Sequence, residues 1–404
     1  MKEILGFLEK QKEYHTPGEI KKGLDILGIK FPKNKVILVT GTNGKGSTCA
    51  TLQTLLIASG KNVGFFSSPH IIRINERIKY NGADISDKDF CRIFRIIHEK
   101  VKHFHFSFFE YLMLISCYYF FFEKHIDFAI FEIGLGGTLD ATNAIDHDIS
   151  VITRIGIDHE DVLGKGLIAI ARNKFGIIRK NNVVFHTKFP KEISYVYFKC
   201  LLEKNAQFFE APNLNYFIQK KKYPEYFVEI NNRNYKLNLL GERAIENTSL
   251  AIEIFKYLVP NYSEYLSAVQ DVNWPCRMEK VLYKNRDVFL SGDHNPQGIQ
   301  SLMKILKHFR FESIHFIVGI CFDKDSDQMI EQLKSVRNAH IYLTETPVKT
   351  LALESYSEFV KSNAEFSSKD QIKTLDQAVK NADDNDLILV TGSLYLTSLI
   401  KQKL

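Results

Sequence analysis

The chain has 404 residues, of which 45% are hydrophobic and 25% are charged, an ordinary composition for a globular protein. This length predicts two or three domains, and the composition excludes disorder, collagen and coiled coil as dominant states. The net charge of +6 is too small to indicate a nucleic-acid partner. We interpret it as an ordinary solvated surface that slightly favours small anions.

The six cysteines form no C-x-x-C pair, so the sequence predicts no disulfide framework. Reduced thiols indicate a cytoplasmic protein. Residues 1–12 alternate charged and apolar residues like an amphipathic helix and lack the apolar centre of a signal peptide. The longest apolar run, Tyr111–Phe122, is too short to span a bilayer and predicts a buried helix, which argues against a membrane partner.

Short apolar runs alternate with helical spacing along the first half of the chain. We expect strands at Val36–Thr40, Val63–Phe66, Phe128–Ile133 and Ile149–Thr153, and a helix at Gly46–Ser59. Strands that alternate with helices predict an α/β fold with a doubly wound, mostly parallel sheet. Such sheets bind ligands at the carboxyl ends of their strands.

The same pattern restarts after Pro275, which breaks regular structure. It predicts a smaller, Rossmann-like α/β domain, with strands at Val288–Ser291, Ile314–Gly319, Ile341–Thr344 and Leu387–Thr391. The intervening segment Asn181–Asn238 contains short strand-like pieces and is assigned to the first domain. We therefore divide the chain into a larger first domain, residues 1–274, and a smaller C-terminal domain, residues 275–404.

The strongest local signal is V-T-G-T-N-G-K-G-S-T at residues 39–48, which follows a predicted strand and opens a predicted helix. Glycines let backbone N–H groups point at phosphate oxygens, and the helix N-terminus adds partial positive charge. Lys45 then neutralises phosphates, and Ser47 or Thr48 reaches Mg²⁺. The nucleotide-binding residues predicted here are Asn43, Gly44, Lys45, Gly46, Ser47 and Thr48.

Three further motifs are weak by themselves. Glu132 ends a predicted strand beside glycines, and is either a ligand for a hard cation or a surface charge. His159 is either a metal ligand or a residue at a helix start. Residues 291–296, S-G-D-H-N-P, form either a tight turn or polar groups aimed at a nucleotide.

Together these motifs resemble the folylpolyglutamate synthase/dihydrofolate synthase family of the Mur ligase superfamily. The resemblance runs through nearly the whole chain, including E-I-G-L-G-G-T-L-D-A-T-N at residues 132–143. The other matching segments are residues 41–48, 67–70, 75–78, 108–110, 158–159, 174–177, 274–277, 294–296, 323–325 and 390–393. Several unrelated short motifs in the right order indicate common ancestry.

The resemblance implies an ATP-dependent ligase acting on dihydropteroate, on folate or on both. The acid takes the γ-phosphoryl group of ATP, and the amine of L-glutamate attacks the resulting acyl phosphate. One alternative is a Mur-type ligase with another acid, although only about 40 residues precede the phosphate loop, too few for a domain of usual size. The other is a P-loop NTPase without ligation, which leaves the motif at residues 174–177 unexplained.

The resemblance also implies roles for particular residues. Lys45, Lys174 and His159 would be catalytic, and Lys174 matches a lysine that is carbamylated by CO₂. A first Mg²⁺ would be held by Ser47, Ser68 and Glu132, and a second by His159. The predicted residues of the nucleotide site are completed by Asn247, Arg277, Ser291, Asp293 and His294, and those of the acid site are Phe108, Phe109, Leu139, Asp140 and Ala141.

The chain departs from the family pattern at several of these places. Ser291 stands where relatives have an Asp that binds ribose, so that either Asp293 supplies the carboxylate or ribose binding is weaker. The other departures are Thr138, Asn173, Arg243 and Cys276, where relatives usually have Arg, Glu, His and Gly. Nucleotide ligands on both domains imply closure on the substrates. We also expect a monomeric protein.

Overall fold

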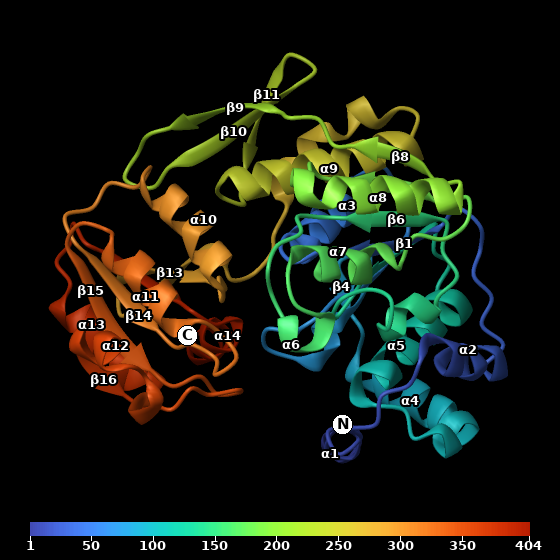
Figure 1. Ribbon diagram of the computed structural model, residues 1–404, viewed down its shortest axis with the longest axis horizontal. Helices are drawn as coiled ribbons and strands as arrows, with labels where there is room; N and C mark the ends of the chain where they lie inside the picture. The colour runs from blue at the N-terminus through green and yellow to red at the C-terminus, as the bar shows by residue number, and fades with distance from the viewer. The chain divides into compact units, whose positions relative to one another are not determined.

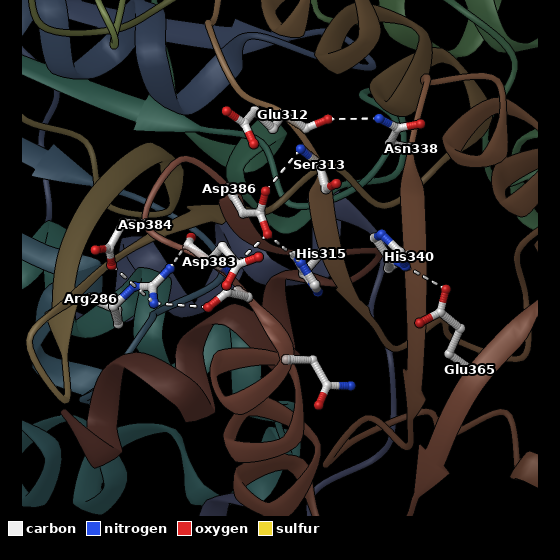
Figure 2. A network of polar contacts seen from close by, with 12 residues as sticks. Arg286, Glu312, Ser313, His315, Asn338, His340, Glu365, Asp383, Asp384 and Asp386 are labelled. Carbon is white, nitrogen blue, oxygen red and sulfur yellow. Dashed lines mark hydrogen bonds and ion pairs between the residues drawn. The ribbon is translucent and has the colours of Figure 1, made fainter.

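The computed structural model describes residues 1–404 as two compact units, shown in Figure 1. The first unit comprises Met1–Leu214 and Glu246–Val272, and the second comprises Asn215–Ile245 and Asn273–Leu404. Helix α9 (Glu242–Leu258) therefore contributes its first turn to the second unit and its remainder to the first.

The first unit contains an eight-stranded sheet in the order β4-β3-β2-β5-β1-β6-β7-β8. Its strands are β1 (Val36–Thr40), β2 (Val63–Phe66), β3 (Ile78–Tyr80), β4 (Ala83–Asp84), β5 (Phe128–Glu132), β6 (Ile149–Ile152), β7 (Val183–His186) and β8 (Gln207–Glu210). All neighbours are parallel except β2–β3 and β3–β4. The chain proceeds from β1 to one side and later returns to β6 on the other, so the sheet is doubly wound as predicted.

Strand β1 is buried along its whole length, which explains its uninterrupted apolar sequence. Val36 and Leu38 share one core cluster with Phe66 and Phe131. Because side chains alternate along a strand, the neighbouring residues of β1 face the opposite side, where α3 (Lys45–Ala58) contacts the sheet. Helices on both faces thus fix the carboxyl end of β1.

Seven more helices belong to the first unit. They are α1 (Lys2–Leu8), α2 (Pro17–Ile26), α4 (Asp87–Val101), α5 (Phe108–Tyr118), α6 (Glu160–Leu163), α7 (Leu167–Phe175) and α8 (Lys191–Lys204). Helix α5 begins with a capping box between Ser107 and Glu110 and continues as a π-helical turn through Tyr119–Glu123. The predicted buried helix at residues 111–122 is confirmed as far as Phe120, whereas Phe122 is exposed.

The second unit contains a six-stranded sheet in the order β12-β13-β17-β14-β15-β16, in which only β12 is antiparallel to its neighbour. Its strands are β12 (Arg277–Tyr283), β13 (Arg286–Ser291), β14 (Ile314–Val318), β15 (Ala339–Thr344), β16 (Ala364–Ser368) and β17 (Leu387–Thr391). Its helices are α10 (Pro296–Leu306), α11 (Ser326–Lys334), α12 (Glu358–Ser362), α13 (Gln371–Asn381) and α14 (Leu394–Lys403). The predicted smaller α/β fold is confirmed.

A three-stranded antiparallel sheet, β9 (Asn215–Gln219), β10 (Glu225–Ile230) and β11 (Arg233–Leu237), belongs to the second unit, although the sequence division assigned it to the first domain. Contacts of Tyr223 explain the difference. Its hydroxyl donates to Asp287 at 2.7 Å, and its ring centroid lies 5.0 Å from that of Phe289. No helix in the described chain is both long and apolar enough to cross a membrane.

Candidate active site

The phosphate loop follows β1 and lies between the ends of β5 and β6, the two neighbours of β1. Gly44 is the N-cap of α3 and has a φ of 96°, which favours glycine. A Cβ on Gly44 would lie 2.4 Å from Oδ1 of Asn247, so the loop backbone and this amide approach too closely for any side chain. The structure therefore brings Asn247 against the predicted loop, from a position far along the chain.

Two lysines meet at the start of this loop. Lys45 Nζ donates to the carbonyl oxygen of Gly41 at 3.1 Å, and Lys174 Nζ donates to the same oxygen at 2.9 Å. Lys174 is only 4% exposed, and burial, reinforced by the charge of Lys45, lowers its pKa to about 7. Lys174 is thus a buried amine that changes its charge near neutral pH, which sets it apart from a solvated helix lysine.

Glu132 ends β5, and the segment that carries Ser68 follows the neighbouring strand β2. The backbone N–H of Ser68 donates to Oε2 of Glu132 at 3.2 Å, and Glu132 is 4% exposed. Two residues predicted from separate motifs are therefore adjacent at the carboxyl ends of parallel strands. Ser47 and Thr48 lie in the first turn of α3, which packs against β5.

His159 precedes α6 in the segment that follows β6, and its φ of 53° is unusual for a residue other than glycine. Its backbone N–H donates to Oδ1 of Asp158 at 3.0 Å. The same segment is tied to the phosphate loop because the hydroxyl of Thr42 donates to the carbonyl of Gly156 and accepts from its N–H, both at 3.0 Å. These hydrogen bonds attach the backbone that leads to His159 to the phosphate loop.

The predicted acid-binding residues lie around the glycine-rich segment 134–140. Asp140 is buried, and its carboxylate accepts from the N–H of Leu135 at 2.9 Å and from the hydroxyl of Thr142 at 2.6 Å. Burial raises the pKa of Asp140. Leu139, in contrast, is 68% exposed, so it is available to a ligand.

Phe108 and Phe109 are the first two residues of α5, and Phe109 packs against this segment. The ring of Phe109 lies where a Cβ on Gly134 would contact it at 2.9 Å, and its centroid is 5.5 Å from that of Phe66. The guanidinium of Arg77 lies over the ring of Phe108, 5.6 Å from its centroid. Ala141 is buried in the turn that follows Asp140.

The second unit has its own polar group at the carboxyl end of β13. The hydroxyl of Ser291 donates to Oδ2 of Asp293 at 2.7 Å, and Arg243 pairs with Oδ1 of Asp293 at 3.5 Å. Nδ1 of His294 lies 3.0 Å from the carbonyl oxygen of Gly292. Nη1 of Arg277 would lie 2.8 Å from a Cβ on Gly292, so these predicted residues form one cluster.

Comparison with known proteins agrees with this arrangement. Residues 39–255 match the family model described as Mur ligase middle domain, and residues 276–394 match Mur ligase, glutamate ligase domain. A relative from Buchnera aphidicola subsp. Schizaphis graminum, named dihydrofolate synthase/folylpolyglutamate synthase, is 33% identical over 97% of this chain and 94% of its own length. The chain belongs to the dihydrofolate synthase/folylpolyglutamate synthase family of Mur ligases.

Other members of this family lead to the same conclusion. A Bacillus subtilis (strain 168) protein of the same name is 30% identical over 96% of this chain and 94% of its own length. Mycobacterium tuberculosis folylpolyglutamate synthase complexed with ADP has a TM-score of 0.89 at 24% identity, covering 99% of this chain and 97% of that one. A bifunctional folylpolyglutamate synthase/dihydrofolate synthase with Mn, AMPPNP and L-glutamate bound has a TM-score of 0.84 at 26% identity, covering 99% and 96%. The chain is thus an ATP-dependent ligase, as the sequence predicted.

The donors in this ligase suit a hard divalent cation bound together with nucleotide phosphates. The hydroxyl of Thr48 is buried and has no hydrogen-bond partner, as expected of a group that serves a ligand. No three His, Cys, Asp or Glu side chains of the described chain gather as a metal site. A cation here would therefore depend on hydroxyl and phosphate oxygens besides Glu132.

Two features of this ligase site were missed by the sequence analysis. Glu76 accepts hydrogen bonds from three successive backbone N–H groups, those of Ile71, Ile72 and Arg73, at 2.7, 2.8 and 2.8 Å. Gly137 packs directly on α7, because its Cβ would lie 2.8 Å from the carbonyl oxygen of Asn173. Glu76 lies in the matching segment at residues 75–78, but nothing in the sequence showed which backbone the glutamate holds.

Proposed function

We propose that this ligase adds L-glutamate to dihydropteroate, to folate or to both. The observation that carries the proposal is the convergence of Lys45, Lys174 and Glu132 beside one phosphate loop, in a chain of this family. Phosphoryl transfer to a carboxylate requires charge neutralisation and alignment. The glycine-rich loop, the buried amine and the buried carboxylate are groups that can supply them.

In this proposal, the carboxylate of the acid substrate attacks the γ-phosphorus of ATP and ADP leaves. The amine of L-glutamate then attacks the acyl carbon, and the tetrahedral intermediate collapses to the amide and inorganic phosphate. Lys45 and the loop amides hold the phosphates while charge develops on them. Every step transfers a group between substrates, so the protein supplies positioning, charge and exclusion of water.

We propose that Ser47, Ser68 and Glu132 hold a first Mg²⁺ and that His159 contributes to a second. Bound Mg²⁺ would supply charge neutralisation to the phosphates. The low pKa of Lys174 supports carbamylation, because only the neutral amine attacks CO₂ and the pKa of about 7 makes that form abundant. The product would carry the negative charge that a cation site needs.

For the nucleotide, we propose that Asn247 contacts adenine and that Arg277, Ser291, Asp293 and His294 take part from the second unit. The carboxylate of Asp293, held by Ser291 and Arg243, supports the version in which Asp293 replaces a ribose-binding Asp. For the acid, we propose Phe108, Phe109, Leu139, Asp140 and Ala141. An aromatic pair and an exposed leucine offer apolar surface to a flat heterocycle.

A substrate panel tests the proposed function. The purified protein is incubated with ATP, Mg²⁺, L-glutamate and either dihydropteroate, folate or no acid, and phosphate release and glutamylated product are measured. We expect phosphate release that requires an acid and equals product formed. ATP hydrolysis that is indifferent to every acid would instead support a P-loop NTPase, and activity with only unrelated acids would support another Mur-type substrate.

We also propose a cytoplasmic, monomeric protein. Its six cysteines are all free in the structure, which supports a reducing compartment. Size-exclusion chromatography with light scattering distinguishes a mass of 46.6 kDa from that of a dimer.

A further inference from the structure

His70 has a hydrogen bond that fixes its chemistry. Arg77 Nε donates to His70 Nδ1 at 2.9 Å. A guanidinium has no acceptor, so Nδ1 must carry the lone pair rather than a proton. A neutral imidazole has one N–H, and in this tautomer it lies on Nε2. The bond thus defines the histidine as an acceptor toward Arg77.

The backbone around His70 is fixed independently of that bond. The carboxylate of Glu76 accepts from the N–H groups of the three residues that follow His70, as described above. Two residues before His70, the N–H of Ser68 donates to Glu132. His70 is therefore held from both sides in a preorganised turn, adjoining the buried carboxylate at the end of β5.

Arg77 connects this turn to the predicted acid site. It is only 9% exposed, and its guanidinium lies over the ring of Phe108. A guanidinium beside an aromatic face can take a carboxylate and a flat ring together. The planar fork turns as one body, so an acceptor at Nε constrains the direction of the whole guanidinium.

We propose that His70 is a positioning residue for Arg77: its Nδ1 accepts the Nε–H and fixes the guanidinium over Phe108, where the arginine helps to seat the carboxylate-bearing heteroaromatic substrate. This proposal rests on the proposed function, because it needs an acid with a flat ring. It assigns His70 no contact with the reacting atoms. Its role is exerted through the orientation of Arg77.

Three substitutions separate an acceptor role from other roles. In His70→Asn, the amide oxygen can occupy the place of Nδ1 and still accept from Arg77. In His70→Gln the amide lies closer to the place of Nε2, and in His70→Leu no acceptor remains. We expect the KM for the acid to stay within about twofold in His70→Asn and to rise about tenfold in the other two, with the KM for ATP unchanged.

Equilibrium binding of the acid without ATP, followed by calorimetry, gives a readout that does not depend on turnover. We expect the same order of affinities as for KM. The control is His125→Asn, an exposed histidine for which we expect wild-type values. Thermal unfolding of each variant shows whether it remains folded.

Nitrogen-15 NMR of histidine-labelled wild-type protein, assigned with His70→Asn, reports the tautomer directly. We expect a neutral imidazole protonated at Nε2. A proton on Nδ1, a loss in His70→Asn equal to that in His70→Leu, or wild-type affinity in all three variants would overturn the proposal. If wild-type protein ligates no folate or pteroate, the proposed function fails, whereas the NMR spectrum still tests the His70–Arg77 bond.

Discussion

Two ammonium groups converge on one carbonyl oxygen, that of Gly41, and this arrangement affects both lysines. Lys45 is at the start of α3, where bound phosphates would attract it away from that oxygen. Lys174 is buried, so its charged form is disfavoured by burial and by Lys45 together. Lys174 therefore provides an amine whose charge depends on pH, next to the phosphate loop.

Replacing Lys45 with alanine should reduce acid-dependent ATP turnover at least about 100-fold, because phosphate charge is left uncompensated. Steady-state phosphate release measures the effect. Lys61→Ala, just beyond the same helix, serves as the matched control and should leave the rate unchanged. Turnover near the wild-type rate in Lys45→Ala would remove this lysine from the nucleotide site.

Replacing Lys174 with methionine should stabilise the unmodified protein at low pH. The pKa of Lys174 is about 7 in the folded chain and near 10.5 when unfolded, so the folded state binds fewer protons. The resulting destabilisation of the wild type is absent above pH 10.5, grows as the pH falls, and is complete below pH 7. We expect a gain for Lys174→Met of no more than about 5 kcal/mol below pH 7.

Urea unfolding across this pH range, in buffers depleted of CO₂, measures the gain. A difference between Lys174→Met and wild type that stays constant with pH would contradict the assignment of the lowered pKa. The same variant should lack ligase activity, and short carboxylates should restore part of it if the proposed carbamate is required. Full activity without any addition would mean that Lys174 has no role in catalysis.

At the scale of elements, the glycine-rich segment and α7 form one assembly. The N–H and hydroxyl of Thr138 both donate to the carbonyl oxygen of Asn173, at 3.0 and 2.8 Å. Gly137 lies against the same turn of α7. Because Lys174 is the next residue along that helix, the segment that follows β5 determines where the buried amine lies.

Gly137→Ala should therefore reduce activity as well as stability. Its Cβ would lie 2.8 and 2.9 Å from two backbone oxygens of α7, so the helix has to shift. We expect the free energy of unfolding to fall by about 1–3 kcal/mol. We also expect kcat to decrease in protein that is still folded, because the shift of α7 moves Lys174. Gly6→Ala in α1, where no atom lies within 4 Å of the added carbon, is the matched control.

Strands were predicted well because buried parallel strands have a simple sequence pattern. Val36–Thr40, Val63–Phe66 and Leu387–Thr391 are observed with the predicted bounds. The segment at residues 181–238 was harder, because α8 exposes Tyr195 and Leu202 and so lacks the usual polar outer face. The contacts of Tyr223, in the connection between β9 and β10, with Asp287 and Phe289 have no local signal at all.

Site residues were predicted from motifs, whereas their contacts were not. The adjacency of Ser68 and Glu132 follows from two strands being neighbours in the sheet, which the general rule for parallel sheets anticipates. Asn247 and Gly44 are far apart in the sequence, so their close contact depends on tertiary packing. The roles of the metal-binding, nucleotide-binding and acid-binding residues remain predictions; among the predicted site residues, the variants above examine Lys45 and Lys174.

At the scale of the whole molecule, the two units differ in how their cores are completed. The second unit contains its own six-stranded sheet, but one side of its core uses Tyr223, which lies in the connection between β9 and β10. The ring of Tyr223 contacts Phe289 and Phe309, with centroids 5.0 and 6.1 Å apart. The β9–β11 sheet is therefore a structural part of the second unit, although it precedes the strands of the six-stranded sheet by many residues.

Tyr223→Ala should destabilise the second unit selectively, by about 2 kcal/mol, because ring contacts and a hydrogen bond to Asp287 are lost. Amide hydrogen exchange resolves the effect by segment. We expect faster exchange in β13 and unchanged exchange in β1. Tyr14→Ala, at a side chain that is 87% exposed, is the control. Equal acceleration in both units would mean that they unfold as one.

The discontinuity of the first unit has a consequence for synthesis on the ribosome. Domains generally fold as they emerge, from the N-terminus onward. Here the first unit is interrupted by residues 215–245 and is completed only by Glu246–Val272. Asn247, which lies against Gly44 of the phosphate loop, is thus made some 200 residues after that loop. The first unit of the nascent chain is therefore incomplete while the β9–β11 sheet is being made. Tyr223, in the β9–β10 connection, stays exposed until its partners Phe289 and Phe309 have been made.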